Sequence, residues 1–128
     1  MTRKFIETGP GLPNWPNPIS HAVVVGKMCF VSGQLSVNEG GEYVEGTVAE
    51  EATLAFNNVF AALKAAGFDK SEIVYIDIAF SDLAKLEEVN QIYMTLFPKG
   101  KRPARTVYEA AKLPFGGKVK IVATAAKD

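Results

Sequence analysis

The chain has very few residues that form disulfides or bind metal ions. One cysteine and one histidine occur among its 128 residues, which excludes an intrachain disulfide and any metal site built from several cysteines or histidines. Cys29 lies in the apolar run 28–31, where nothing adjacent would lower its thiol pKa, so we interpret it as core filling. His21 lacks the companions of a metal site or of a catalytic Cys-His or Ser-His pair, and we interpret it as structural.

The chain also lacks a charge bias and a long apolar run. Lys plus Arg and Asp plus Glu are balanced at 14 each, so no positive field attracts nucleic acid and no polybasic stretch marks a membrane surface. No segment approaches the roughly 20 apolar residues of a membrane span, and the N-terminus has no secretory signal pattern. We expect a cytoplasmic protein with neither nucleic acid nor membrane as partner, folded as a single domain over residues 1–128.

Short runs rich in β-branched and aromatic residues predict the strands. Residues 21–25 and 28–32 flank the two-residue turn Gly26-Lys27, which is a hairpin signal. Further strands are predicted at residues 4–7, 73–80, 104–110 and 118–125. Residues 9–18 read as an ordered loop because of their prolines and glycines, and residues 36–46 as a polar loop.

Two amphipathic helices are expected between these strands. Thr47 and Glu50 form a capping-box pattern, followed by apolar residues at helical spacing until Gly67. Asp82 is the expected cap of a second helix that closes at Pro98 and Gly100. Its inward side chains are predicted to be Leu83, Leu86, Val89, Ile92 or Tyr93, and Leu96.

This order of elements predicts an α+β fold with a single mixed sheet and two helices on one face. In the last strand, alternation separates two sets of side chains: Val119, Ile121, Ala123 and Ala125 on one side, and Lys120, Val122 and Thr124 on the other. The second side is apolar enough to need cover, although it carries a charge. Self-association is the simplest way to cover it.

Arg105 begins an apolar strand-like run and is the most informative residue of the chain. A guanidinium presents a planar fork of donors that matches a carboxylate, and a rigid strand would let it orient a small organic acid. The alternative from spacing alone is an exposed arginine in a surface salt bridge.

Five motifs along the chain carry a resemblance to a known family. They are Val31-Ser32-Gly33-Gln34; Asn57-Asn58-Val59 with Leu63-Lys64-Ala65-Ala66-Gly67; Val89-Asn90 with Tyr93 and Phe97; Arg102-Pro103-Ala104-Arg105; and Leu113-Pro114. With these motifs the chain resembles, nearly end to end, the RidA/YjgF reactive intermediate deaminases, once described as translation inhibitors or endoribonucleases. The Pro-Ala-Arg and Leu-Pro motifs at this spacing are fairly specific, whereas Ser-Gly-Gln alone would be weak.

The resemblance implies a chorismate-mutase-like fold assembled as a homotrimer with three ligand clefts between subunits. Arg105 would bind the substrate carboxylate and act in catalysis, and Ser32 would line the cleft. Val107 and Asn90 are also implied as substrate-binding residues, as are the positions of Ile19 and Lys120. The implied reaction hydrolyses enamines or imines of carboxylic acids to 2-oxo acids and ammonia, with no metal and no organic cofactor.

Two positions depart from the family pattern. Deaminating members commonly have a glutamate where this chain has Lys120, and a tyrosine where it has Ile19. A lysine of ordinary pKa about 10.4 cannot take a proton from water at neutral pH unless its pKa falls by about 3 units, which costs about 4 kcal/mol. Lys120 could therefore be a lysine of depressed pKa, a second anion contact beside Arg105, part of a binding site without catalysis, or a side chain that reaches to solvent.

We predict that the protein hydrolyses enamine or imine carboxylic acids without a cofactor. Its substrate can differ from 2-iminobutanoate, the usual substrate implied by the resemblance. The main alternative is a trimer that binds small carboxylic acids without catalysis. A weaker one is the endoribonuclease or translation-inhibitor role, which the neutral charge and the lack of a basic aromatic strip disfavour. The sequence names neither the substrate, nor the pathway, nor a protein partner.

Overall fold

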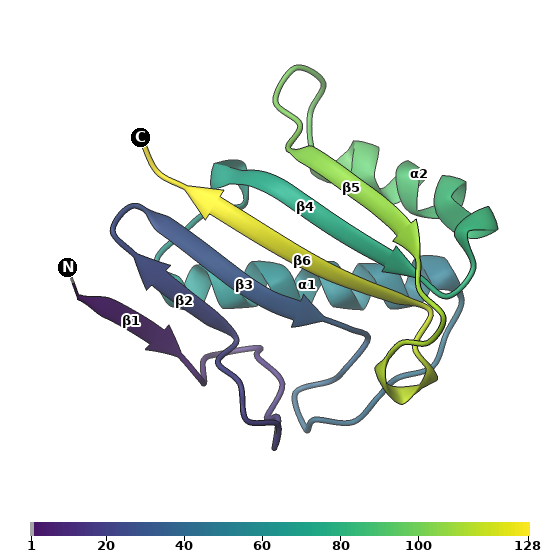
Figure 1. Cartoon of the computed structure of the whole chain (residues 1–128), viewed down its shortest axis with the longest axis horizontal. Helices are drawn as coiled ribbons and strands as arrows, with labels where there is room; N and C mark the ends of the chain where they lie inside the picture. The colour runs from purple at the N-terminus through teal and green to yellow at the C-terminus, as the bar shows by residue number, and fades with distance from the viewer. Residues whose placement is uncertain (1) are drawn as a thin grey trace.

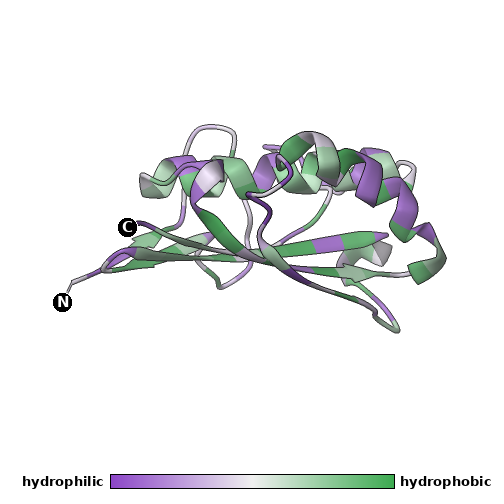
Figure 2. Cartoon of the chain, turned by 90° about the horizontal axis from the view of Figure 1, so that it is seen from above, coloured by the Kyte–Doolittle hydropathy of each residue, from purple (hydrophilic) through white to green (hydrophobic). Residues whose placement is uncertain are grey.

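The computed structural model describes residues 2–128, which form one six-stranded sheet with two α-helices. The elements are β1 (Arg3–Ile6), β2 (Ala22–Val25), β3 (Met28–Gln34), α1 (Val48–Ala66), β4 (Ile73–Phe80), α2 (Leu86–Leu96), β5 (Ala104–Glu109) and β6 (Val119–Ala126). The strand order is β1-β2-β3-β6-β4-β5, and only β4 and β5 pair in parallel. Both helices pack on the same face of this mixed sheet (Figures 1 and 2), as the sequence predicts.

The first helix begins and ends where its caps predict. The Glu50 N–H donates to Thr47 Oγ1 at 3.1 Å, and the Thr47 N–H donates to the Glu50 carboxylate at 2.9 Å, which completes the capping box. Gly67 ends the helix with a φ of 84°, a left-handed conformation that costs glycine little.

The start of the second helix differs from the prediction. Asp82 caps the short 3-10 helix Leu83–Lys85 by accepting from the Ala84 N–H, and α2 begins only at Leu86. The inward position predicted for Leu83 is wrong, because this residue lies in a turn with about three residues per turn rather than 3.6, and it is exposed. Of the two candidates further along, Tyr93 is the buried one.

The two faces of the sheet have opposite character. Val119, Ile121, Ala123 and Ala125 are buried under the helices, as the alternation predicts. On the other face, strand register aligns one row across five strands: Phe5, Val23, Phe30, Thr124 and Tyr75. Phe5, Phe30 and Tyr75 are exposed, so residues 2–128 leave an apolar row without cover.

Buried polar and sulfur groups of this fold are structural. Cys29 is fully buried, and burial raises the pKa of its thiol to about 11, which confirms core filling. The buried His21 has both ring nitrogens in contact: Nε2 lies 2.9 Å from the Pro13 carbonyl oxygen and Nδ1 lies 3.2 Å from Gln34 Nε2. Neither helix in the described part of the chain combines the length and apolar character needed to cross a membrane.

The loop after β3 is less exposed than its polar composition suggests. Leu35, Ser36 and Val37 are buried, and the side-chain amide of Asn58 on α1 donates to the carbonyl oxygens of Leu35 and Val37 at 3.0 and 2.9 Å. The backbone of this loop is therefore fastened to α1. Asn58, one of the motif residues, has a structural role.

Candidate functional site

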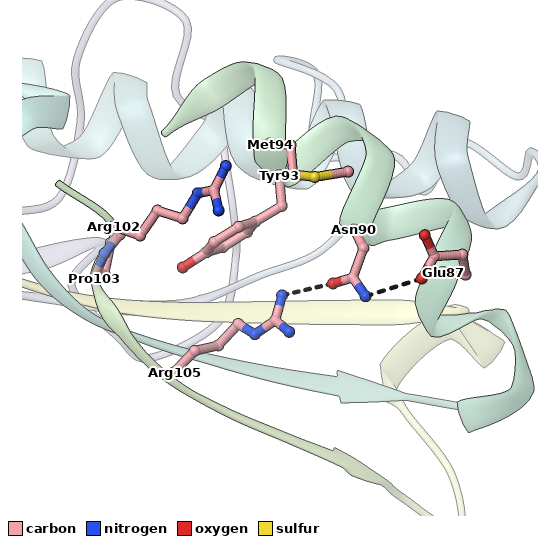
Figure 3. A pocket seen from close by; sticks show the side chains of 7 residues that line it. All are labelled: Glu87, Asn90, Tyr93, Met94, Arg102, Pro103 and Arg105. Atoms are coloured by element: carbon pink, nitrogen blue, oxygen red, sulfur yellow. Dashed lines mark hydrogen bonds between the residues drawn. The ribbon is translucent and has the colours of Figure 1, made fainter. Parts of the chain in front are cut away.

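Arg105 points from the edge strand β5 toward α2. It pairs with Ile76 of β4, whose side chain is buried under the helices, so the alternation of strands places Arg105 on the helix-covered face. Because β5 is the last strand of the sheet, the side chain opens into a hollow of about 420 Å³ between β5 and α2 (Figure 3). The lining residues are Glu87, Asn90, Tyr93, Met94, Arg102, Pro103 and Arg105.

Contacts from α2 fix the orientation of this guanidinium. Arg105 Nη1 donates to Asn90 Oδ1 at 2.8 Å, and its central carbon lies 4.7 Å from the centroid of the Tyr93 ring, a cation–π arrangement. Asn90 Nδ2 in turn donates to the Glu87 carboxylate at 3.3 Å. One edge of the guanidinium is thereby occupied, and the remaining donors have no acceptor among residues 2–128. A carboxylate fits such a free edge.

The alternative of a surface salt bridge does not hold for Arg105. No carboxylate of the described residues lies within 4.0 Å of its nitrogens; the ion pairs found involve Lys85, Lys118 and Lys127 instead. Among residues 2–128 the hydrogen-bond partner of this half-buried guanidinium is a neutral amide, so its positive charge stays available to a ligand.

Tyr93 lines the hollow, with its ring between Arg102 and Arg105. Its hydroxyl is buried and has no hydrogen-bond partner among residues 2–128. Burial raises the pKa of this phenol more than the positive charges of Arg105 and Arg102 lower it. The hydroxyl therefore stays protonated at neutral pH and remains a free donor.

The residues expected to bind substrate fall into two groups within one chain. Asn90 contacts Arg105 directly, and Val107 lies two residues further along the same face of β5. Ser32 and Lys120 lie on the opposite face of the sheet: Lys120 pairs with Ala79 and alternates with the buried Val119 and Ile121.

A local cluster forms around that second group. The Ser32 hydroxyl donates to the Ser20 carbonyl oxygen at 2.6 Å. The exposed Ile19 directly precedes Ser20 in the chain. The Lys120 side chain passes over Gly33, where a β-carbon would lie 3.0 Å from Lys120 Cδ. Within one chain, therefore, Lys120 is not the second anion contact beside Arg105 that the sequence suggests. The odd and even positions of β5 and β6 put the two cations on different faces.

Sequence reasoning missed part of the arginine hollow. Glu87 and Met94 are not among the site residues expected from the sequence; Arg102 is named there only as a member of a motif, and Tyr93 only as a motif member and a candidate inward side chain of the second helix. A usable signal was the spacing of Glu87, Asn90 and Met94 at i, i+3 and i+7, which places them on one face of α2. In residues 2–128, no three His, Cys, Asp or Glu side chains are arranged to hold a metal ion.

Comparison with known proteins gives consistent relatives over nearly the whole chain. A family model described as endoribonuclease L-PSP matches residues 13–127. A 2-iminobutanoate/2-iminopropanoate deaminase of Bos taurus is 39% identical over 126 residues, covering 98% of this chain and 90% of the bovine protein. The human protein of the same name is 37% identical with the same coverage.

Solved structures agree with these relatives. The YjgF gene product of E. coli superimposes with a TM-score of 0.88 at 34% identity, covering 98% of this chain and 99% of the other. RidA from an Antarctic Psychrobacter gives a TM-score of 0.88 at 30% identity, covering 97% and 99%. The strand order and the two helices on one face are therefore those of proteins with related sequences.

Proposed function

Since this chain belongs to the endoribonuclease L-PSP family, which includes the RidA/YjgF reactive intermediate deaminases, we propose that it hydrolyses 2-imino acids or their enamine tautomers to 2-oxo acids and ammonia. The observation that carries the proposal is the Arg105 guanidinium, which Asn90 and Tyr93 hold with one edge free in an open hollow. The deaminase names of the relatives support the reaction class.

The proposed reaction needs a held carboxylate and a positioned water. Arg105 binds the carboxylate with its free edge and fixes the adjacent C=N carbon in place. Water forms a C–O bond at that carbon and transfers one proton to the imine nitrogen. The new hydroxyl then gives its remaining proton to nitrogen as the C–N bond breaks, so that ammonia leaves and the carbonyl forms. Every atom comes from the imine and water.

The cleft is proposed to form between copies of the chain in a homotrimer. Arg105 and the pair Ser32 and Lys120 lie on opposite faces of one sheet, so a single chain cannot bring them to one ligand. A second copy that covers the exposed apolar row could place its own Ser32 and Lys120 near Arg105 of its neighbour.

Lys120 supports one competing function, a trimer that binds small carboxylic acids without turning them over. Deaminases of the family commonly have a glutamate at this position, and a lysine lacks the carboxylate that would polarise the attacking water. An endoribonuclease role has less support, because the chain has no net positive charge.

A coupled assay separates the catalyst from the binder. A pyridoxal-phosphate dehydratase releases the imine from threonine, and semicarbazide traps whatever imine survives. If the protein is a catalyst, it would suppress semicarbazone formation at roughly a hundredth of the imine concentration. If it only binds the imine, suppression would need a stoichiometric amount of protein. Arg105→Ala serves as the inactive control. Semicarbazone formation that is unchanged by stoichiometric natural protein would refute both functions.

A further inference from the structure

The hollow beside α2 contains a second guanidinium besides that of Arg105. Arg102 and Arg105 both line it; Arg105 lies in β5, and Arg102 lies three residues earlier, in the loop before this strand. Figure 3 shows the two side chains entering the same space from one wall, with the Tyr93 ring between them. A single carboxylate needs only one such fork.

A hydrogen bond to the backbone holds Arg102 in place, but no carboxylate among residues 2–128 neutralises its charge. Its Nε donates to the Phe97 carbonyl oxygen at 3.2 Å, which anchors the base of the guanidinium beside the C-terminus of α2. Its two terminal nitrogens have no acceptor and no carboxylate within ion-pair distance among residues 2–128. This side chain is thus oriented at one end and available to a ligand at the other.

The remaining lining residues favour one orientation of a bound acid. The Glu87 carboxylate lies on the far side of Asn90 and would repel a second acidic group placed there. The Tyr93 side chain lies between the two arginines, and its buried hydroxyl, without a partner among residues 2–128, is an additional donor on the Arg102 side. A second acidic group would therefore turn toward Arg102.

We propose that Arg102 is a second carboxylate anchor, and that this cleft prefers 2-imino acids with an additional carboxylate in the side chain, the imines of acidic amino acids. The proposal rests on the proposed function for its chemistry and on the Arg102–Arg105 pair for its selectivity. Arg105 would hold the carboxylate next to the imine, and Arg102 the carboxylate at the other end.

The 2-oxo acid products serve as stable probes. Titration calorimetry would compare 2-oxobutanoate, with one carboxylate, and 2-oxoglutarate, with two, on the intact natural protein. Hydrogen bonds to a charged carboxylate are strong, but screening by water in this open hollow keeps their effect at the low end of the range, so we expect 2-oxoglutarate to bind about tenfold more tightly. Arg102→Gln should remove this preference and leave 2-oxobutanoate binding within about twofold, because one carboxylate does not reach Arg102.

Two control variants make the result specific. Lys101→Gln removes one positive charge from the neighbouring, exposed residue, which does not line the hollow, and should keep the preference. Arg102→Lys keeps the charge but loses the fork, and should keep part of the preference. Thermal unfolding of each variant checks the fold. If Arg102→Gln does not fold, Arg102→Lys alone must still reduce the preference.

The outcomes separate this proposal from the proposed function. Equal affinity of the natural protein for the two acids would overturn it, as would an Arg102→Gln variant that loses both acids equally. Turnover of imines generated by an amino-acid oxidase from glutamate and from 2-aminobutanoate tests the chemistry. A tenfold binding preference with no turnover of either imine would uphold the selectivity and reject the deaminase function.

Discussion

At the scale of single residues, the site depends on how α2 holds one guanidinium. Asn90 and Tyr93 immobilise Arg105 before any ligand arrives, so little side-chain entropy is left to lose on binding. Arg105→Ala should therefore weaken 2-oxobutanoate binding by about 1.5 to 3 kcal/mol, or about 10- to 150-fold in Kd. Titration calorimetry measures this, with Lys99→Ala as a control for general charge. Equal affinity in the natural protein and Arg105→Ala would remove Arg105 from the site.

Lys120 sets the second expectation at this scale. If a carboxylate at this position polarises the attacking water in related deaminases, the natural protein should turn over 2-iminobutanoate slowly, and Lys120→Glu should raise kcat by about 10²- to 10⁴-fold. Initial rates of 2-oxobutanoate formation test this, with Lys120→Gln as the matched variant that lacks both charges. Fast turnover by the natural protein, unchanged in Lys120→Glu, would make Lys120 a bystander.

At the scale of elements, a buried carboxylate joins α1 to two loops, the one before α1 and the one before β6. Glu51 is fully buried, yet it accepts hydrogen bonds from the Tyr43 hydroxyl at 2.7 Å, the Gly46 N–H at 3.2 Å and both the N–H and ammonium of Lys118 at 3.0 and 3.1 Å. Burial alone would raise the pKa of Glu51, but these hydrogen bonds outweigh burial and lower it.

The lowered pKa makes this cluster sensitive to acid. Its stabilisation is present above the ordinary carboxyl pKa of about 4.5 and is lost as pH falls through the lower folded value. Glu51→Gln should cost about 3 kcal/mol at pH 7 and much less at pH 3. Urea unfolding at fixed protein concentration measures the difference, with the exposed Glu88→Gln as control. A cost that does not change with pH would contradict this role.

The elements that local chemistry determines could be predicted from the sequence. The capping box, Gly67 and the strands at 73–80 and 104–110 depend on neighbours along the chain, and the structure places them within a residue or so of their expected bounds. The start of α2 was missed because Asp82 caps a 3-10 turn as well as it caps an α-helix. Glu51 was missed because its partners at Gly46 and Lys118 meet only in the folded chain.

The site was predictable only in part for the same physical reason. Arg105 and Asn90 followed from motif resemblance, and the structure brings them into contact. Tyr93 and Glu87 become neighbours of Arg105 only when α2 docks beside β5, a contact between elements that are distant in the sequence. The separation of Lys120 from Arg105 follows from strand pairing across β4.

At the scale of the whole molecule, the uncovered face of the sheet leads us to expect that other copies of the chain cover it. Phe5, Phe30 and Tyr75 expose apolar surface in one row. Removing this surface from water in the interfaces of a symmetric trimer would be favourable. Sedimentation equilibrium should return three times the 13.8 kDa mass of the chain. Phe30→Lys should shift the equilibrium toward monomer, whereas Lys99→Glu, on the loop after α2, should not. A stable monomer at micromolar concentration would contradict the trimer.

Mixed trimers test the composite cleft most directly. Arg105→Ala disables one wall of the cleft and Ser32→Trp blocks the other, so neither variant alone should bind 2-oxobutanoate with natural affinity. After co-assembly from equal amounts, about one cleft in four should pair an intact Arg105 with an intact Ser32 of the next chain, and bind with natural affinity. Calorimetry that finds this fraction of sites would support a cleft shared between chains. A mixture that binds no more than the separate variants would contradict it.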